Sequence, residues 1–392
     1  MKIIIDAMGG DNAPEEIIKG AVRAKRELGV EVCLVGRIED VKACLEKEGC
    51  AEGEFEIVDA REVVTMEDDP STATRRKKDS SMTVALNLLR DGKGDAVVSA
   101  GSTGALLTGA TLIVKRISGI RRAAMAPVLP AGERGVMLID CGANVECTAE
   151  YLLQFAYMGS FYAKKMMGCE NPRVGLLNVG TEDTKGGELQ HQAFALLKNA
   201  DEEGRINFIG NVEGTGVFNG TADVVVTDGF TGNVLLKSTE GVIKYMMKSL
   251  KGVFYKSTKN KLAAAVLKKD LGIMKKSMDV NEVGGTALVG ISKPVIKAHG
   301  SSNAACIFAA VRQAMTFVDA GVIDDIKANI EYMKLKAEQE WINLKRRSAT
   351  ASKTAACSLP RSRTAPMPTS ATARPARAMS ALSSLATPFS AT

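Results

Sequence analysis

The sequence has little of several features that mark whole classes of protein. It contains one tryptophan and only 5% aromatic residues, and no basic stripe is interleaved with aromatics, which disfavours nucleic-acid binding. Its eight cysteines form no CxxC pair, so a reducing, cytoplasmic setting is expected. No signal peptide precedes the first strand-like segment, and no uncharged apolar stretch reaches the ~18 residues of a membrane span. At most, we expect contact with a membrane surface.

The net charge of +6 is concentrated at one end of the chain. Of 51 Lys and Arg residues, seven lie in 346–392, which has no acidic residue, leaving 44 basic against 45 acidic residues in 1–345. The segment 346–392 is rich in Ser, Thr, Ala, Pro and Arg without periodicity, which is typical of disorder. We therefore expect one nearly neutral domain over 1–345 and a disordered tail over 346–392.

Short apolar runs recur, each followed by a glycine-containing turn and then, in most cases, by helical spacing. The first run is Lys2–Asp6, and helical spacing starts at Glu15, with Asn12 or Ala13 where a helix cap is needed. Further runs begin near Asp95, Val136, Val174, Asn207 and Asp223. Continuous β-branched runs separated by helices predict an α/β fold with a mostly parallel, doubly wound sheet. The loops at the strand carboxyl ends would then assemble one site.

Two of these loops are suited to hold an anion. Gly101–Gly104 and Gly229–Asn233 each open a helix, where free backbone N–H groups and the helix dipole favour phosphate. The same residue types are standard turn formers, so turn geometry alone is the alternative. The chain has no GxxxxGK[ST], and no GxGxxG with an acidic residue ~20 positions later. ATP hydrolysis and Rossmann dinucleotide binding are therefore disfavoured.

Two ionisable side chains lie in such loops. Lys185 follows a buried-type strand and could reach a phosphate or an oxyanion, unless it is only a solvated partner of Glu182 or Asp183. His299 opens a helix among glycine and hydroxyl residues, so it could donate a proton or bind phosphate. A capping or buried histidine is the alternative. His191 is expected at the surface of a helix.

The sequence gives no sign of a metal or cofactor site. It lacks HExxH, Cys/His ligand spacing and an EF-hand loop, so we expect no metal and no cofactor. Asp6, Asp11 and Asp140 could gather at strand ends, but an aspartate at a turn is commonly a cap.

Two basic segments are candidates for contact with partners. The run Arg75, Arg76, Lys77 and Lys78 could dock an acidic partner or a phosphopantetheine phosphate, although such runs are usually only solvated. Residues 235–279 have helical spacing with eleven Lys against three acidic residues. Subunit packing is the favoured interpretation, with an acidic carrier protein or anionic lipid as alternatives.

Seven motifs in order, between residue 1 and about residue 335, identify a family. They are Asp6–Asp11, Ser99–Leu106, Asp140–Asn144, Leu177–Asp183, Phe208–Glu213, Val226–Val234 and Pro294–Ser302. Together they resemble the phosphate acyltransferase (PlsX) family of bacterial phospholipid synthesis. The family's fold resembles those of phosphotransacetylases and isopropylmalate-type dehydrogenases. Its members end soon after the segment that matches 322–345, so the tail departs from the pattern.

The resemblance implies transfer of a long-chain acyl group from acyl-acyl carrier protein to inorganic phosphate, which yields acyl phosphate for a membrane glycerol-3-phosphate acyltransferase. It also implies a homodimer that can associate peripherally with membrane. By motif position, Lys185 would stabilise phosphate or the oxyanion, Asn233 would orient phosphate or the carbonyl, and His299 is a candidate proton donor to the thiolate. Further donors would come from Gly101, Ser102, Thr103, Gly104, Thr231 and Gly232.

Three other functions are compatible with parts of this pattern. A phosphotransacetylase that uses acyl-CoA shares the chemistry but not the carrier. A decarboxylating dehydrogenase of the isopropylmalate type is suggested by fold analogy alone. A non-catalytic scaffold at the membrane surface would use only the basic region 235–279.

Overall fold

A computed structural model describes residues 1–132, 134–277 and 284–333. The chain divides into two units, Met1–Glu340 and Trp341–Thr392, and all described residues belong to the first. The tail predicted over 346–392 lies outside the described residues and stays a prediction. Residues 278 and 279 of the basic region also lie outside them.

The first sheet has seven strands. In spatial order they are β3 (Glu56–Asp59), β2 (Glu31–Gly36), β1 (Lys2–Asp6), β4 (Ala96–Ser99), β12 (Val295–Lys297), β11 (Thr286–Val289) and β5 (Ala124–Ala126). All neighbours from β3 to β12 are parallel, whereas β11 runs antiparallel to both β12 and β5. The carboxyl ends of the parallel strands therefore share one edge.

The second sheet has five strands. In spatial order they are β6 (Val128–Leu129), β7 (Val136–Ile139), β10 (Val224–Val226), β8 (Arg173–Leu177) and β9 (Asn207–Val212). All are parallel except β6. The predicted mostly parallel α/β fold is confirmed, but its strands divide between two sheets. Apolar runs predict strands without predicting which strands pair, because pairing depends on tertiary packing.

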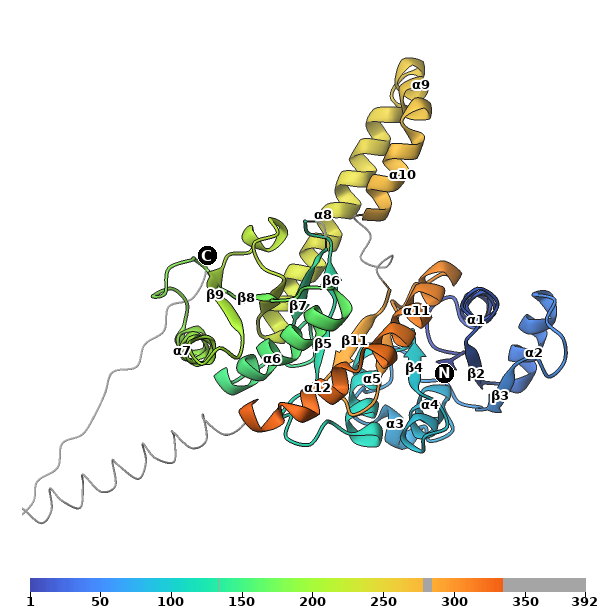
Figure 1. Cartoon of the computed structure of the whole chain (residues 1–392). Helices are drawn as coiled ribbons and strands as arrows, with labels where there is room; N and C mark the ends of the chain where they lie inside the picture. The colour runs from blue at the N-terminus through green and yellow to red at the C-terminus, as the bar shows by residue number, and fades with distance from the viewer. Residues whose placement is uncertain (133, 278–283, 334–392) are drawn as a thin grey trace, which may run out of the picture. The chain divides into compact units, whose positions relative to one another are not determined.

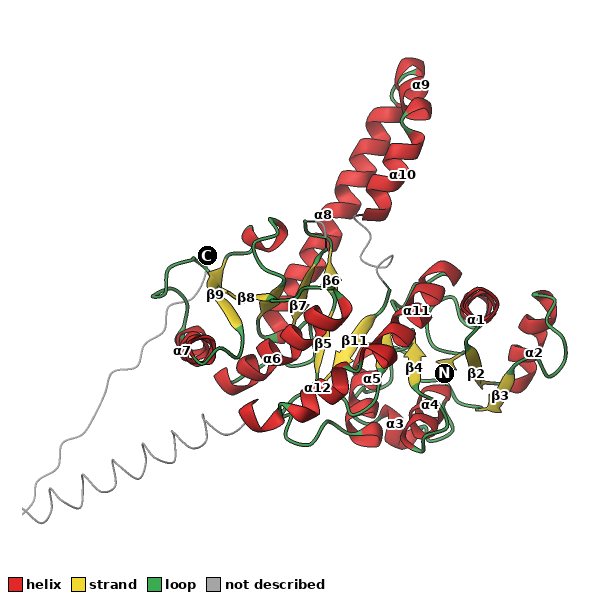
Figure 2. Ribbon diagram, viewed as in Figure 1, coloured by secondary structure: helices red, strands yellow, loops and turns green. Residues whose placement is uncertain are grey.

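Helices cover both faces of the sheets, as a doubly wound fold requires (Figure 2). Alternation along β1 sends Ile3 and Ile5 into one core cluster with Ile17, and Ile4 into the other with Leu86. The helices are α1 (Glu15–Leu28), α2 (Ile38–Lys47), α3 (Ala73–Arg76), α4 (Ser81–Arg90), α5 (Thr103–Gly109, continued as a π-helix over Ala110–Val114), α6 (Ala149–Met166), α7 (Glu188–Glu202), a 3₁₀ turn (Gly216–Phe218), α8 (Gly229–Tyr255), α9 (Thr258–Val266), α10 (Lys268–Ser277), α11 (Ala304–Ala320) and α12 (Val322–Ala328). Burial on both faces explains why these strands read as continuous apolar runs.

One described stretch, Ala304–Ala328, is long and apolar enough by composition to cross a membrane. It comprises α11 and α12. Helix α11 packs along α1, where a side chain on Gly20 would approach Ile307 to 2.6 Å. Ile307, Val311 and Phe317 are buried in the core. Core packing therefore uses one apolar face of this stretch.

Most of residues 235–277 are helical, in α8, α9 and α10. Helix α9 packs against α8, and Figure 1 shows the three helices extending beyond the sheets. Large apolar side chains are exposed along them, namely Val242, Tyr245, Met246, Val253, Tyr255, Leu262, Val266, Leu267 and Met274. A helical surface of this composition is typical of an interface rather than of a solvated face.

Candidate active site

Loops from both sheets line one cavity of about 250 Å³. Its polar lining comes from segments far apart in the chain: Thr103 after β4, Cys141 after β7, Asn233, Lys237 and Glu240 on α8, and Lys297 and His299 at the end of β12. These positions lie at strand carboxyl ends or on the helix that follows, where open α/β sheets bind ligands. The structure thus brings together Thr103, Asn233 and His299 from the residues that the sequence predicted.

His299 is oriented by Ser301. The backbone N–H of Ser301 donates to Nδ1 at 3.2 Å, and the Ser301 hydroxyl lies 2.9 Å from the same atom. Because Nδ1 accepts this bond, the neutral ring carries its proton on Nε2. Burial, followed by the charge of Lys237, lowers the pKa of His299 below its ordinary value. At neutral pH His299 is therefore an uncharged ring with an N–H donor at Nε2.

The loop that carries His299 is held by Asn12. Its Nδ2 donates to the carbonyl oxygens of Ser301 and Ser302, each at 3.2 Å. Helix α1 begins after Pro14 without a side-chain cap. The predicted capping role of Asn12 is wrong, because its amide bonds across to the His299 loop instead of along its own helix.

Asn233 begins the second turn of α8 and lies against the loop that follows β7. A Cβ on Gly142, whose φ is 94°, would lie 3.6 Å from the Asn233 side chain. A side chain on Gly232 would overlap the carbonyl oxygen of Asp140, so only glycine fits at this position of α8. The Asp140 carboxylate accepts the backbone N–H of Asn144 at 2.7 Å and so fixes this loop. The position of Asn233 is thus set by close backbone packing.

Asp228 caps α8 and engages Thr231. Its carboxylate accepts the Thr231 backbone N–H and hydroxyl, each at 2.8 Å, and the Gly232 N–H donates to the Asp228 carbonyl at 3.0 Å. The donors that Thr231 and Gly232 were predicted to offer phosphate are therefore already bonded within the helix start. Their role in phosphate binding stays a prediction.

The loop after β4 is shaped by a buried hydroxyl. Ser99 donates to the Asp6 carboxylate at 2.6 Å and accepts the Gly101 N–H at 3.1 Å. Thr103 then begins α5 and lines the cavity. The predicted donors of this loop that do not line the cavity are Gly101, Ser102 and Gly104.

Lys185 is exposed in the loop after β8 and does not line the cavity. His191, exposed as expected, holds the loop through the carbonyl oxygen of Thr184 at 3.0 Å. In the described part of the chain, no ion pair joins Lys185 to Glu182 or Asp183. The ion pair that the alternative interpretation of Lys185 requires is therefore not observed. The assignment of Lys185 to phosphate or oxyanion stabilisation stays a prediction.

A lysine to which the sequence analysis gave no role lines the cavity. Lys297 ends β12 directly opposite Ser99 and is only 7% exposed. Its Nζ donates to the carbonyl oxygens of Ala100, at 3.3 Å, and Ala298. Burial lowers its pKa to about 8. The available signal was a lysine closing a buried run two residues before His299, but lysine at a strand end usually extends to solvent.

The cavity also contains a thiol. Cys141 is buried, and this burial raises its pKa well above the ordinary range of cysteine. A cysteine acts as a nucleophile only as its thiolate. Cys141 is therefore not suited to form a covalent intermediate.

The aspartates at the strand ends do not gather into a metal site. Among the described residues, no group of three or more His, Cys, Asp or Glu side chains could hold an ion. Asp6 is bonded to Ser99, and Asp140 to the loop after β7. Burial raises the pKa of both carboxyls. These two carboxyl groups therefore hold the backbone of their own loops.

The four residues of the basic run differ in their exposure to solvent. Arg75, Arg76 and Lys78 are exposed, whereas Lys77 is partly buried and forms an ion pair with Asp68 at 2.6 Å. The charge of Lys77 is thus matched within the chain. Three of the four predicted docking residues remain open to a partner.

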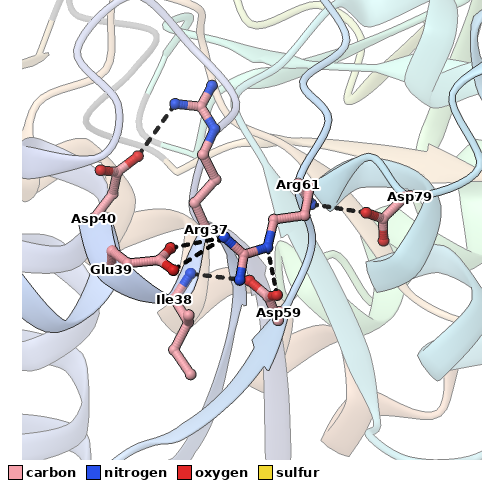
Figure 3. Close-up of polar contacts among 7 residues, drawn as sticks. All are labelled: Arg37, Ile38, Glu39, Asp40, Asp59, Arg61 and Asp79. Carbon is pink, nitrogen blue, oxygen red and sulfur yellow. Dashed lines mark hydrogen bonds and ion pairs between the residues drawn. The ribbon is translucent and has the colours of Figure 1, made fainter.

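Figure 3 shows how the end of this run is fixed to the first sheet. The Arg61 guanidinium donates to Glu39 at 3.0 Å and to Asp59 at 2.6 Å. The Arg61 backbone N–H donates to the Asp79 carboxylate at 3.1 Å. Asp79 directly follows Lys78 in the sequence. The basic run is therefore held at the carboxyl end of β3.

Comparisons with known proteins identify the family of this chain. The family described as fatty acid synthesis protein matches residues 1–325. A phosphate acyltransferase of Oceanobacillus iheyensis is 47% identical over 341 residues, which cover 87% of this chain and 100% of the relative. One from Geobacillus thermodenitrificans is 49% identical, covering 84% and 99%.

Solved structures of phosphotransacetylases share the fold. One from Streptococcus pyogenes has a TM-score of 0.57 at 19% identity, covering 81% of this chain and 94% of that chain. The EutD phosphotransacetylase of Staphylococcus aureus has a TM-score of 0.52 at 17% identity, covering 82% and 94%. The predicted likeness to the phosphotransacetylase fold is confirmed.

Proposed function

This chain belongs to the fatty acid synthesis protein family of phosphate acyltransferases, and we propose that it transfers a long-chain acyl group from acyl-acyl carrier protein to inorganic phosphate. The chain is an acyltransferase, and acyl transfer to phosphate is the activity for which its relatives are named. The carrier protein as donor, and phospholipid synthesis as the use of the acyl phosphate, are the proposal.

The observation that supports this reaction most is a cavity lined by hydrogen-bond donors whose thiol, Cys141, stays protonated. Phosphate is itself an anionic nucleophile at neutral pH, so no side chain has to be activated. An oxygen of HPO₄²⁻ attacks the thioester carbonyl carbon, and the C–O bond forms as an oxyanion develops. Collapse of this intermediate breaks the C–S bond, and the proton of the phosphate ends on the sulfur.

Asn233 and His299 are suited to different parts of this step. Both the Asn233 amide and the Nε2–H of His299 can donate to a phosphate oxygen or to the developing oxyanion. Because His299 is neutral at pH 7, it supplies a hydrogen bond rather than a charge. A thiolate with an ordinary pKa of ~8.5 leaves without strong acid assistance, so proton donation by His299 is the minor part of its role.

The basic run supports a protein donor over a free coenzyme. Arg75, Arg76 and Lys78 are exposed and held at the carboxyl end of β3. Exposed guanidinium and ammonium groups attract an acidic carrier protein and bind the phosphate of its prosthetic group. Acyl-CoA is the competing donor, and it lacks the protein surface that the run would contact.

The exposed apolar side chains on α8 and α9 support assembly. We propose that these helices pack between two copies of the chain, with peripheral contact to anionic lipid near their lysines. A cytoplasmic homodimer of this kind would pass acyl phosphate to a membrane glycerol-3-phosphate acyltransferase. Sedimentation of the full chain tests the dimer, and flotation with vesicles of anionic phospholipid tests the membrane contact.

The reaction is tested by mixing the full-length protein with palmitoyl-acyl carrier protein and phosphate, and trapping acyl phosphate as its hydroxamate. Palmitoyl-CoA replaces the carrier in a parallel reaction. We expect phosphate-dependent hydroxamate, with a higher kcat/KM for the carrier protein. Equal or better use of palmitoyl-CoA would reject the proposed donor, and absence of product from both would reject the proposed reaction.

A further inference from the structure

We propose that Lys297 is a catalytic residue whose ammonium binds the attacking phosphate, an inference that rests on the proposed function. The main support for this proposal is the position of Lys297 in the fold. Lys297 ends a central strand of the first sheet, lines the cavity together with Asn233 and His299, and is almost fully buried. A lysine in such a place is not explained by solvation.

The hydrogen bonds of Lys297 leave part of its donor capacity open. An ammonium group has three N–H donors. Two are accounted for by the carbonyl oxygens of Ala100 and Ala298. The carbonyls fix where Nζ lies but are neutral, so they do not balance its charge. A phosphate oxygen in the cavity would accept the third N–H and supply that balance.

The charges around Lys297 favour an anion in the cavity. Among the described residues, Lys297 has no carboxylate within ion-pair distance, although Asp6 and Asp11 raise its pKa through space. Burial is the larger effect and lowers the pKa to about 8, so the ammonium still predominates at neutral pH. A buried cation without a contacting counter-charge is costly, and a bound dianion would relieve this cost.

The other lysines near the site are less suited to this task. Lys237 also lines the cavity, but its Nζ is paired with Glu240 at 3.0 Å. Lys185 is exposed, where water and salt screen its charge. At an almost fully buried side chain such as Lys297, the same unit charge acts far more strongly on phosphate and on the developing oxyanion. Lys297 is therefore the lysine whose charge is best placed for the attack.

The test compares Lys297→Met with Lys293→Met. Lys293 is a matched control, because it is a half-buried lysine two residues before the same strand whose Nζ donates to the Leu89 carbonyl at 2.7 Å. Lys297→Gln serves as a second variant that keeps N–H donors for the two carbonyls but has no charge. Phosphate KM, carrier-protein KM and the rise in Tm caused by phosphate are measured for each full-length protein.

We expect both Lys297 variants to raise the phosphate KM on the order of 100-fold and to lose the phosphate-dependent rise in Tm, with the carrier-protein KM unchanged. Lys293→Met should behave as wild type. If wild type makes acyl phosphate and either folded Lys297 variant keeps its phosphate KM and Tm response, the inference is overturned while the proposed function stands. If wild type makes no acyl phosphate but its Tm response to phosphate depends on Lys297, the function fails and the phosphate site stands.

Discussion

The end of β12 and the loop that follows β8 hold their lysines in opposite ways. Lys297, at the end of β12, is buried and bonded to two carbonyl oxygens, whereas Lys185, after β8, is exposed and outside the cavity. Desolvation strengthens the field of the first charge on a nearby anion, and solvent weakens the second. Motif position and burial thus point to different lysines, which mutagenesis can separate.

The largest loss of activity is expected at Asn233, on the α8 side of the cavity. Asn233→Ala should lower kcat/KM for phosphate by about 10²–10³-fold, because it removes a fixed donor to developing negative charge. Asn87→Ala is the control, since the amide of Asn87 donates only to the Thr83 carbonyl within its own helix. Steady-state kinetics measure both variants. Wild-type rates for Asn233→Ala would mean that residues at the end of β12 stabilise the developing negative charge without a donor from α8.

The pH dependence of the reaction tests the charge of Lys297. The charged and titratable groups that face it are Asp6 at the end of β1, Asp11 in the loop after it, Lys237 and Glu240 on α8, and His299 after β12. Since phosphate binding needs the ammonium, kcat/KM for phosphate should fall as pH rises through about 8. The expected slope is about tenfold per pH unit.

Stability should move in the other direction over this range. Unfolded Lys297 keeps its proton up to its ordinary pKa of 10.5, whereas the folded protein loses it at about 8. The unfolded state binds more protons in between, so this group makes unfolding less favourable as pH rises. Urea titrations at several pH values check that lost activity is not unfolding. A profile that stays flat to pH 10 in folded protein would exclude a required ammonium.

A smaller effect is expected at the exposed lysine. Lys185→Ala should lower kcat/KM about tenfold, because a solvent-screened charge contributes less than a buried one. The loss should shrink in high salt, whereas the effect of Lys297→Met should persist. If Lys185→Ala instead abolishes turnover, the loop after β8 must close over the cavity during the reaction, and the contrast between the two lysines would be lost.

A further effect is expected at the basic run, which does not line the cavity. Charge reversal of Arg75, Arg76 and Lys78 to Glu should raise the KM for acyl-acyl carrier protein about fivefold to tenfold, through lost electrostatic steering. Activity with acyl-CoA should fall less, because CoA shares the phosphopantetheine phosphate but lacks the acidic protein surface of the carrier. Lys93→Glu, at an exposed position between α4 and β4, is the control. An equal loss with both donors would assign the run to catalysis or folding instead of docking.

Much of the fold follows from local patterns in the sequence. The run Lys2–Asp6, the turn after it and the helix from Glu15 are observed as β1 and α1, because apolar periodicity and glycine turns act locally. The division into two sheets was not predicted, since strand pairing depends on contacts between distant segments. Asn12 was misassigned for the same reason: its bonds cross to Ser301 and Ser302.

The candidate site was predictable in part. Thr103, Asn233 and His299 line the cavity because each lies in or near a glycine-containing loop at a strand carboxyl end. Lys297 was missed, because the burial of a strand-end lysine depends on the neighbouring strand and on α8. Only the tertiary structure reveals that it faces a cavity instead of solvent.

The central claim is that phosphate itself attacks the thioester, and isotope exchange tests it most directly. The full-length protein is incubated with palmitoyl-acyl carrier protein and ¹⁵N-labelled free carrier protein, with and without phosphate, and labelled palmitoyl-carrier protein is measured by mass spectrometry. We expect the acyl group to reach the labelled carrier only when phosphate is present, by reversal through acyl phosphate. Exchange without phosphate would show an acyl-enzyme intermediate and contradict the account.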